Sequence, residues 1–167
     1  KRVAAGLAFD KMPDAPVAAA PVQEMEPSPA LQIIGKMKDT LMGRAIGILI
    51  ADGSDGAVIK KIKKAATDAG ATVKIVAPKV GGAKLADGSM LAADGQLAGT
   101  PSVLFDAVAV ILSDEGAKAL SMESAAIDFV RDAFGHLKAI AVDQGGRTLL
   151  EIAQVGQDAG VVDSDDK

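Results

Sequence analysis

Two adjoining stretches decide the fold of this chain: Ala45-Ile46-Gly47-Ile48-Leu49-Ile50-Ala51 and Asp52-Gly53-Ser54-Asp55-Gly56. The first is a continuous apolar run rich in β-branched residues, which is typical of a strand buried on both faces. The second combines glycines with helix-capping side chains, which indicates a tight turn that leads into a helix. We therefore expect a buried parallel strand, followed by a helix that Asp55 caps.

The helix after this turn is expected to be amphipathic and to end at Gly70. A second apolar strand follows at residues 72–77 and ends at Pro78, which completes a right-handed βαβ unit. Four lysines lie on this helix, and they predict a solvated helix face rather than a nucleic-acid-binding patch because the chain as a whole is acidic. The apolar stripe is predicted at Val58, Ile62, Ala65 and Ala69, and the lysines are Lys60, Lys61, Lys63 and Lys64.

The rest of the chain continues the alternation of strands and helices. Asp87-Gly88 predicts a hairpin turn within residues 83–91, and Asp94-Gly95 predicts a further turn. Strands are expected at residues 108–112 and 138–142, with a short edge strand at Val161-Val162. One helix is expected to end at Gly135 and another to run from about residue 147 to 155. The stripe of the first of these helices comprises Met122, Ala125, Ala126, Phe129, Val130, Ala133 and Phe134.

This order of elements predicts an α/β fold, namely a three-layer sandwich of flavodoxin-like type with a doubly wound, mostly parallel sheet. Composition places the start of this domain near residue 43, because five of the seven prolines precede it. Residues 1–42 are interpreted as an extended, proline-rich linker or a disordered tail, residues 43–163 as the folded domain and residues 164–167 as an acidic tail. Apolar side chains are expected to let the linker pack against its own domain or a neighbour: Leu31, Ile33, Ile34, Met37 and Leu41.

The composition excludes several classes of site. The 167 residues include no Cys, no Tyr and no Trp, so a disulfide framework and a thiolate nucleophile are impossible. A zinc or haem site would depend almost entirely on His136, the single histidine. Four Phe and a net charge of −4 argue against nucleic acid as a partner, and no apolar run predicts a membrane span.

Three acidic loops are expected to meet at the carboxyl edge of the sheet, where doubly wound folds bind ligands. They are Asp52–Gly56, Ser113–Gly116 and Asp143–Gly146. Clustered carboxylates there suggest a divalent cation or an acid/base pair, whereas helix capping explains the same residues without a ligand. Phosphate or flavin binding at the first loop is a further alternative to a structural turn. The candidate carboxylates are Asp52, Asp55, Asp114, Glu115 and Asp143.

Asp143 occupies a sharp strand-to-helix turn of the kind that exposes a nucleophile in hydrolase-like α/β proteins. Such an elbow normally carries Ser or Cys with a nearby His base, and this chain has Asp. Ser113 supplies a hydroxyl on a neighbouring loop, but His136 precedes a strand and is expected at the opposite end of the sheet. The sequence therefore argues against a Ser–His pair and favours a surface or helix-end position for His136.

Several runs in this chain resemble the C-terminal domain of large-subunit catalases. The runs keep their order over nearly the whole chain, and Lys1–Phe9 then resembles the end of a catalase core. They are residues 27–31, 43–53, 76–82, 86–89, 101–108 and 128–134, for example Gly43-Arg44-Ala45-Ile46-Gly47 and Asp128-Phe129-Val130-Arg131-Asp132-Ala133-Phe134. The resemblance implies a parent haem homotetramer, cytoplasmic or secreted, that decomposes hydrogen peroxide to water and oxygen.

In such catalases a tyrosinate holds the haem iron and a distal histidine acts on the peroxide. This chain has no Tyr, and nothing around His136 resembles the distal motif, so neither a cofactor nor a metal is expected in it. The domain also resembles the class I glutamine amidotransferase-like superfamily, in which a Cys occupies the elbow. The matching positions here are Asp143 for the Cys, Val58 for a supporting Glu and Leu112-Ser113-Asp114 for the Pro-Gly-Gly oxyanion loop.

The three differences from the superfamily pattern, at Asp143, Val58 and Leu112-Ser113-Asp114, predict a domain without catalytic residues. We expect it to assist folding, stability and tetramer assembly of a catalase, with chaperone-like holdase activity when isolated. Its expected partners are the catalase core, neighbouring subunits and unfolded client proteins. The alternative is a residual hydrolase or amidotransferase-like enzyme, or a binder of a cation or nucleotide, that uses the carboxyl edge of the sheet.

Overall fold

The computed structural model describes residues 7–15, 26, 28–32, 36 and 40–164. The chain divides into two units, Lys1–Lys38 and Asp39–Lys167. In the first unit the described residues form turns and bends, and all of them are exposed. Three of the apolar residues expected to dock the linker, Ile33, Ile34 and Met37, lie outside the described residues, as does most of the segment 1–9. The second unit begins four residues before the boundary expected at residue 43.

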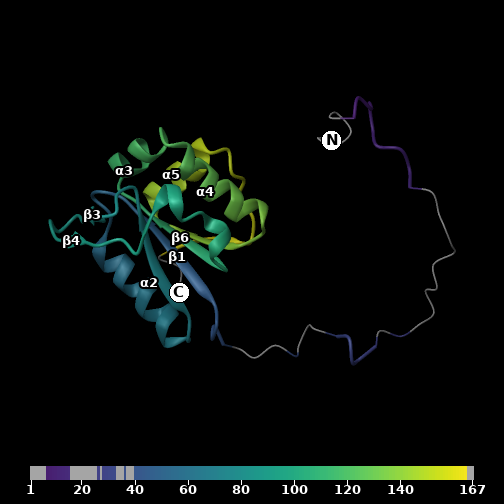
Figure 1. The fold of residues 1–167 in the computed structure, drawn as a ribbon, viewed down its shortest axis with the longest axis horizontal. Coiled ribbons are helices and arrows are strands. Elements are labelled where there is room, and N and C mark those ends of the chain that lie inside the picture. The colour runs from purple at the N-terminus through teal and green to yellow at the C-terminus, as the bar shows by residue number, and fades with distance from the viewer. Residues whose placement is uncertain (1–6, 16–25, 27, 33–35, 37–39, 165–167) are drawn as a thin grey trace. The chain divides into compact units, whose positions relative to one another are not determined.

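The second unit is built on a six-stranded sheet in which every pair of neighbouring strands is parallel (Figure 1). The strand order is β5-β2-β1-β6-β7-β8. The order reverses between β1 and β6, which makes the sheet doubly wound as predicted. The strands are β1 Ala45–Ile50, β2 Thr72–Ala77, β5 Gly95–Gln96, β6 Ala107–Ile111, β7 Ala139–Val142 and β8 Val161–Asp163, and the hairpin predicted around Asp87-Gly88 is β3 Ala83–Lys84 with β4 Met90–Leu91.

Helices cover both faces of the sheet and enclose two separate cores. Alternate residues of β1 point to opposite faces, so Leu49 belongs to one core and Ile48 to the other. The larger core joins the sheet to α3, α4 and α5, and the smaller one joins it to α2 and the hairpin. Figure 1 shows α2 separated by the strands from these three helices. The helices are α2 Gly56–Asp68, α3 Asp114–Leu120, α4 Ser124–Gly135 and α5 Gln144–Ile152, with short 3₁₀ turns η1 Leu97–Gly99 and η2 Ser102–Leu104.

Two predicted helix faces need correction. In α2 the buried face runs through Ile59 and Ala66, whereas Ala65 and Ala69 are exposed, because the stripe is rotated by one residue from the prediction. Met122 was expected on the stripe of the following long helix, but it precedes α4 and its side chain is 87% exposed. The lysines of α2 are exposed, which agrees with the solvated helix face predicted from the sequence.

Four elements were not expected from the sequence: α3, β5 and the 3₁₀ turns η1 and η2. The loop predicted at Ser113–Gly116 continues into α3, and the turn predicted at Asp94-Gly95 opens the edge strand β5. Helix α5 also begins at Gln144, three residues earlier than expected. These additions leave the predicted fold class unchanged.

Candidate functional site

The three acidic loops meet at the carboxyl edge of the sheet. The Ser113 hydroxyl donates a hydrogen bond to the carbonyl oxygen of Asp52 at 2.9 Å, which joins the loop after β6 to the loop after β1. The buried Ser54 hydroxyl donates to the carbonyl of Ile111 at 2.7 Å, which joins the same two segments a second time. Backbone and side-chain hydrogen bonds therefore hold this edge as one network.

Asp143, the elbow residue, is the N-cap of α5. Its carboxylate accepts hydrogen bonds from the backbone N–H of Gly146 at 2.7 Å and from that of Leu112 at 3.0 and 3.1 Å. Its backbone is extended, with φ −93° and ψ −171°, and so lacks the strain of a nucleophile elbow. Burial raises the pKa of this carboxyl above its usual value, while the hydrogen bonds from Gly146 and Leu112 oppose that rise. The carboxylate connects β6 to α5.

Two glycines after Asp143 bring α5 directly onto the backbone of β6. A Cβ on Gly145 would lie 2.1 Å from the carbonyl oxygen of Leu112, and one on Gly146 would lie 2.1 Å from that of Val110. Both distances are far below van der Waals contact. The elbow sequence Asp143-Gln144-Gly145-Gly146 is therefore explained by close helix–strand packing.

The other carboxylates at this edge serve separate parts of the backbone. Asp55 caps α2 by accepting from the N–H of Ala57 at 2.7 Å, and Asp52 accepts from the N–H of Lys84 at 2.8 Å. Asp114 and Glu115 lie in the first turn of α3, where acidic side chains are favoured by the helix dipole. Within residues 40–164 and the shorter described stretches, no three Asp, Glu or His side chains are grouped as a metal site would require. Capping accounts for Asp55 and Asp143 without a ligand.

The remaining candidates do not form a catalytic group with Asp143. Val58 is half-buried and packs against the smaller core. Ser113 caps α3 by accepting from the N–H of Gly116 at 3.0 Å. His136 is exposed at the end of α4, with Nδ1 2.6 Å from the carbonyl oxygen of Asp132, and it precedes β7 at the opposite edge of the sheet. Ser113 and His136 are thus too far apart in the fold to act as a pair.

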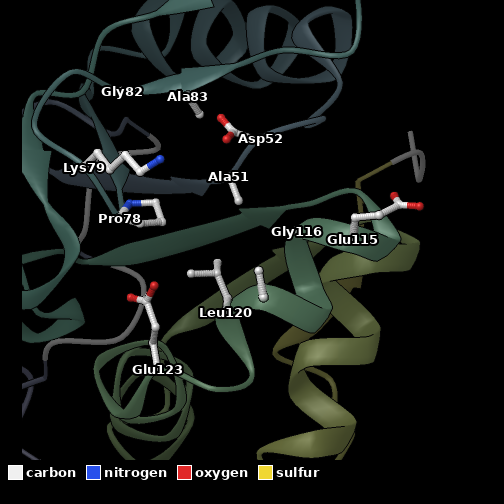
Figure 2. A pocket seen from close by; sticks show the side chains of 11 residues that line it. Ala51, Asp52, Pro78, Lys79, Gly82, Ala83, Glu115, Gly116, Leu120 and Glu123 are labelled. Carbon is white, nitrogen blue, oxygen red and sulfur yellow. The ribbon is translucent and has the colours of Figure 1, made fainter.

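A cavity of about 290 Å³ opens at the carboxyl edge, beside the reversal of strand order. Asp143 is not among its lining residues. Figure 2 shows Asp52, Lys79 and Glu123 around it, each from a different segment, with Leu120 and Pro78 supplying apolar surface. Lys79 and Glu123 were absent from the sequence-based candidates. Lys79 lies two residues after the end of β2, and this position carried the necessary signal because every parallel strand of the sheet ends at this edge.

Among the described residues, no helix is both long enough and apolar enough to cross a membrane.

Comparison with known proteins gives a family for this domain. Residues 42–167 match the family described as the C-terminal domain found in long catalases. Catalase C of Rhizobium meliloti is 40% identical over 99% of this chain, and catalase HPII of Pseudomonas aeruginosa is 30% identical over 85% of it. The matched regions make up 24% and 20% of those relatives, so the chain spans about a quarter of their length or less.

Solved structures share the fold at lower sequence identity. DJ-1beta of Drosophila melanogaster is 22% identical, with a TM-score of 0.63 over 69% of this chain and 62% of its own. The ThiJ/PfpI domain protein of Brachyspira murdochii is 18% identical, with a TM-score of 0.61 over 70% of this chain and 67% of its own. These similarities show that the chain shares the flavodoxin-like α/β fold of these proteins.

Proposed function

The chain belongs to the family of C-terminal domains found in long catalases, and from this premise we propose that it is an accessory domain without a catalytic centre of its own. Its role is to assist the folding, stability and tetramer assembly of a catalase whose peroxide chemistry takes place elsewhere in the protein. The observation that carries this proposal is the use of Asp143. The residue at the elbow is engaged by two backbone N–H groups, that of Gly146 and that of Leu112, and the latter is shared between the two carboxylate oxygens.

The residues of this chain do not fit a haem. A haem iron needs an axial ligand such as Tyr, Cys or His, and the chain contains neither Tyr nor Cys. Its single His136 is exposed, and its Nδ1 lies 2.6 Å from the Asp132 carbonyl oxygen. We infer that the haem of the catalase, and the tyrosinate that holds its iron, belong to the larger remaining part of the protein.

Exposed apolar side chains support a holdase activity of the isolated domain. Met42, Val80, Met122 and Leu137 are large side chains that are at least 75% exposed. Surface of this kind binds the apolar segments of unfolded proteins, because removing apolar area from water is favourable by about 25 cal/mol per Å². The proposed clients are therefore partly unfolded chains, the catalase itself among them.

Two measurements test this proposal. An aggregation-prone client is heated with and without the chain, and light scattering is followed; we expect suppression by the chain and weaker suppression by the Val80→Ser/Met122→Ser variant. Unchanged scattering at molar excess would remove the holdase function. Separately, the complete gene product is compared with a version truncated before residue 43. Equal inactivation temperatures and equal tetramer yields would refute the assembly role.

A second candidate function rests on the cavity at the carboxyl edge. The cavity combines one cation, Lys79, with the carboxylates of Asp52, Glu115 and Glu123, and this excess of negative charge suits a small cationic molecule. A ligand that binds only the native state stabilises it and so raises the melting temperature. At a concentration of 100 times its Kd, the free energy of unfolding increases by about 2.7 kcal/mol. Melting curves with millimolar divalent cations test it, and anionic nucleotides are the comparison expected to give no shift. The absence of any shift with the cations would leave the cavity without a ligand of this class.

A further inference from the structure

The methionines that the structure describes all lie on the surface. Met is among the residues most often fully buried in folded proteins, where its flexible thioether fills gaps in the apolar core. The chain has six, of which Met25 and Met37 lie outside the described residues. The other four are Met12, Met42, Met90 and Met122, which are 47%, 78%, 65% and 87% exposed.

Both cores of the folded unit are built without methionine. In the part of the chain that the structure describes, the buried residues of the two cores are Ala, Val, Leu, Ile and Phe. The partly buried side chains that pack against them belong to the same five types. A chemical change at a described methionine sulfur therefore takes place outside both cores.

The three methionines of the folded unit lie in connections or on the hairpin. Met42 precedes β1, Met122 lies between α3 and α4, and Met90 belongs to β4 of the hairpin (Figure 1). The N–H of Met42 donates to the Thr40 hydroxyl at 3.2 Å. The N–H of Met122 donates to the carbonyl of Ala119, also at 3.2 Å. These bonds use the main chain, so they do not depend on the state of the sulfur.

Met is the one sulfur-containing residue of this chain, because the chain has no Cys. A thioether sulfur attacks one oxygen of hydrogen peroxide; an S–O bond forms, the O–O bond breaks, and proton transfer releases the second oxygen as water. The sulfur loses two electrons, which the peroxide gains, and the product is methionine sulfoxide. This reaction makes an apolar side chain polar, which is costly inside a core and tolerated where the side chain already lies in water.

We propose that Met42, Met90 and Met122 are sites of reversible oxidation by hydrogen peroxide, at which the domain consumes peroxide without losing its fold. The choice of oxidant rests on the proposed function above, because peroxide is the substrate of the catalase to which such a domain is joined. Methionine sulfoxide reductases restore the thioether. In that step two thiols become a disulfide and the sulfoxide oxygen leaves as water. Each cycle removes one molecule of peroxide without using the haem.

The first measurement is the rate of oxidation at each site. This chain is treated with hydrogen peroxide, and the complete gene product is given a continuous supply because its haem decomposes a single dose; mass spectrometry of the peptides then locates the added oxygen. Exposure of between 65% and 87% predicts rates at the three sites within about twofold of those in the chain unfolded in urea.

A buried methionine provides the matched control. Leu149→Met conserves side-chain volume at a position of the larger core that is 0% exposed. Its sulfur should react more than about tenfold more slowly than the surface sites, because peroxide reaches it only when the structure opens. Leu150→Met is the second control, in case Leu149→Met does not fold.

The stability of the oxidised chain distinguishes a tolerated modification from damage. We expect the urea midpoint of the wild-type chain to stay unchanged after oxidation and that of Leu149→Met to fall. A methionine sulfoxide reductase with dithiothreitol should remove the added oxygen from the wild-type chain. The variant Met42→Leu/Met90→Leu/Met122→Leu should unfold at the wild-type midpoint and lose the uptake of oxygen at these positions.

Four results would overturn the oxidation proposal: rates in the folded chain below half of those in the unfolded chain, protection of the three sites in the complete gene product, a lower urea midpoint after oxidation, or no recovery with the reductase. The proposed function fails in a different way. A complete gene product that lacks a haem spectrum and peroxide decomposition would refute it, whatever the pattern of sulfoxides. An active catalase whose C-terminal domain unfolds on oxidation would refute only the oxidation proposal.

Discussion

Replacing Asp143 with alanine should destabilise the domain without removing an activity. The alanine deletes the N-cap of α5, at a cost of about 1 kcal/mol. It also leaves the N–H of Leu112 without its acceptor, and because Leu112 is only 3% exposed, that buried donor costs about 1 to 3 kcal/mol more. We therefore expect the free energy of unfolding to fall by about 2 to 4 kcal/mol.

Urea denaturation followed by circular dichroism measures this change at pH 7, with Asp143→Asn as the matched control. The asparagine keeps one acceptor oxygen, so it should lose less than the alanine. A loss below about 0.5 kcal/mol for Asp143→Ala, the range of an ordinary surface substitution, would refute the structural role. Loss of a measured hydrolysis in a variant that remains fully stable would indicate a catalytic Asp143 instead.

The same carboxyl predicts a pH dependence. Burial raises the pKa of Asp143 above the 3.8 of an unperturbed aspartate, so the folded state binds this proton more tightly than the unfolded state. The contribution of Asp143 to the free energy of unfolding is therefore greatest below pH 3.8, and it is lost as the pH rises through the folded pKa. Relative to Asp143→Asn, the wild-type chain should gain stability as the pH is lowered through the acid range. A trend of opposite sign would mean that the hydrogen bonds outweigh burial.

Three further changes test other parts of the structure by urea unfolding. Gly146→Ala places a Cβ 2.1 Å from the Val110 carbonyl oxygen, so it should cost about 3 kcal/mol, and an unchanged midpoint would contradict the close packing of α5 on β6. Leu137→Gly relieves a left-handed leucine and should stabilise the chain by about 1 kcal/mol, whereas a loss would show that the side chain packs internally. Asp106→Asn removes a carboxyl whose pKa is lowered by hydrogen bonds from the Ala45 N–H and Arg44. The stabilisation by this carboxylate is present above the usual pKa of aspartate and is lost as the pH falls through the folded pKa. The stabilities of wild type and variant should therefore converge in acid and diverge at neutral pH. Equal differences at both pH values would rule out that carboxylate as a source of stability.

Much of the sheet could be predicted because its strands carry a local signal. The β-branched run at residues 45–50 must be buried on both faces, and its continuous apolar character distinguishes it from a surface strand. Asp55 and Asp87-Gly88 likewise act through neighbours in the chain, as a helix cap and a hairpin turn. Such features depend on only a few adjacent residues.

Other elements depend on contacts between distant segments. Strand β5 has only two residues, and it is held at the edge because the Asp94 carboxylate accepts from the N–H of Ile75 at 2.7 Å. The face of α2 was misjudged because alanines at residues 65, 66 and 69 fit two helical stripes equally well, and the hairpin decides between them by packing Leu85 into the core beside Ile59. Neither contact is visible in the local sequence.

The candidate site likewise has features that the local sequence predicts and features that depend on contacts between distant segments. Capping by Asp143 could be predicted from its place before a helix, whereas its bond to Leu112 requires the register in which Val110 of β6 pairs with Val142 of β7. The cavity needed Lys79 and Glu123, which come from segments about 44 residues apart. Only the assembled edge places them around the same space.

The parallel arrangement of all six strands also gives the domain a direction. The chain enters before Ala45 at one edge, and the last strand ends at Asp163 on the other, where Ser164 bonds the carbonyl of Val142 at 2.8 Å. A six-residue strand separates the two edges by about 20 Å. A fluorophore or affinity tag joined after β8 therefore departs from the end of the strands opposite the one at which the chain enters the domain.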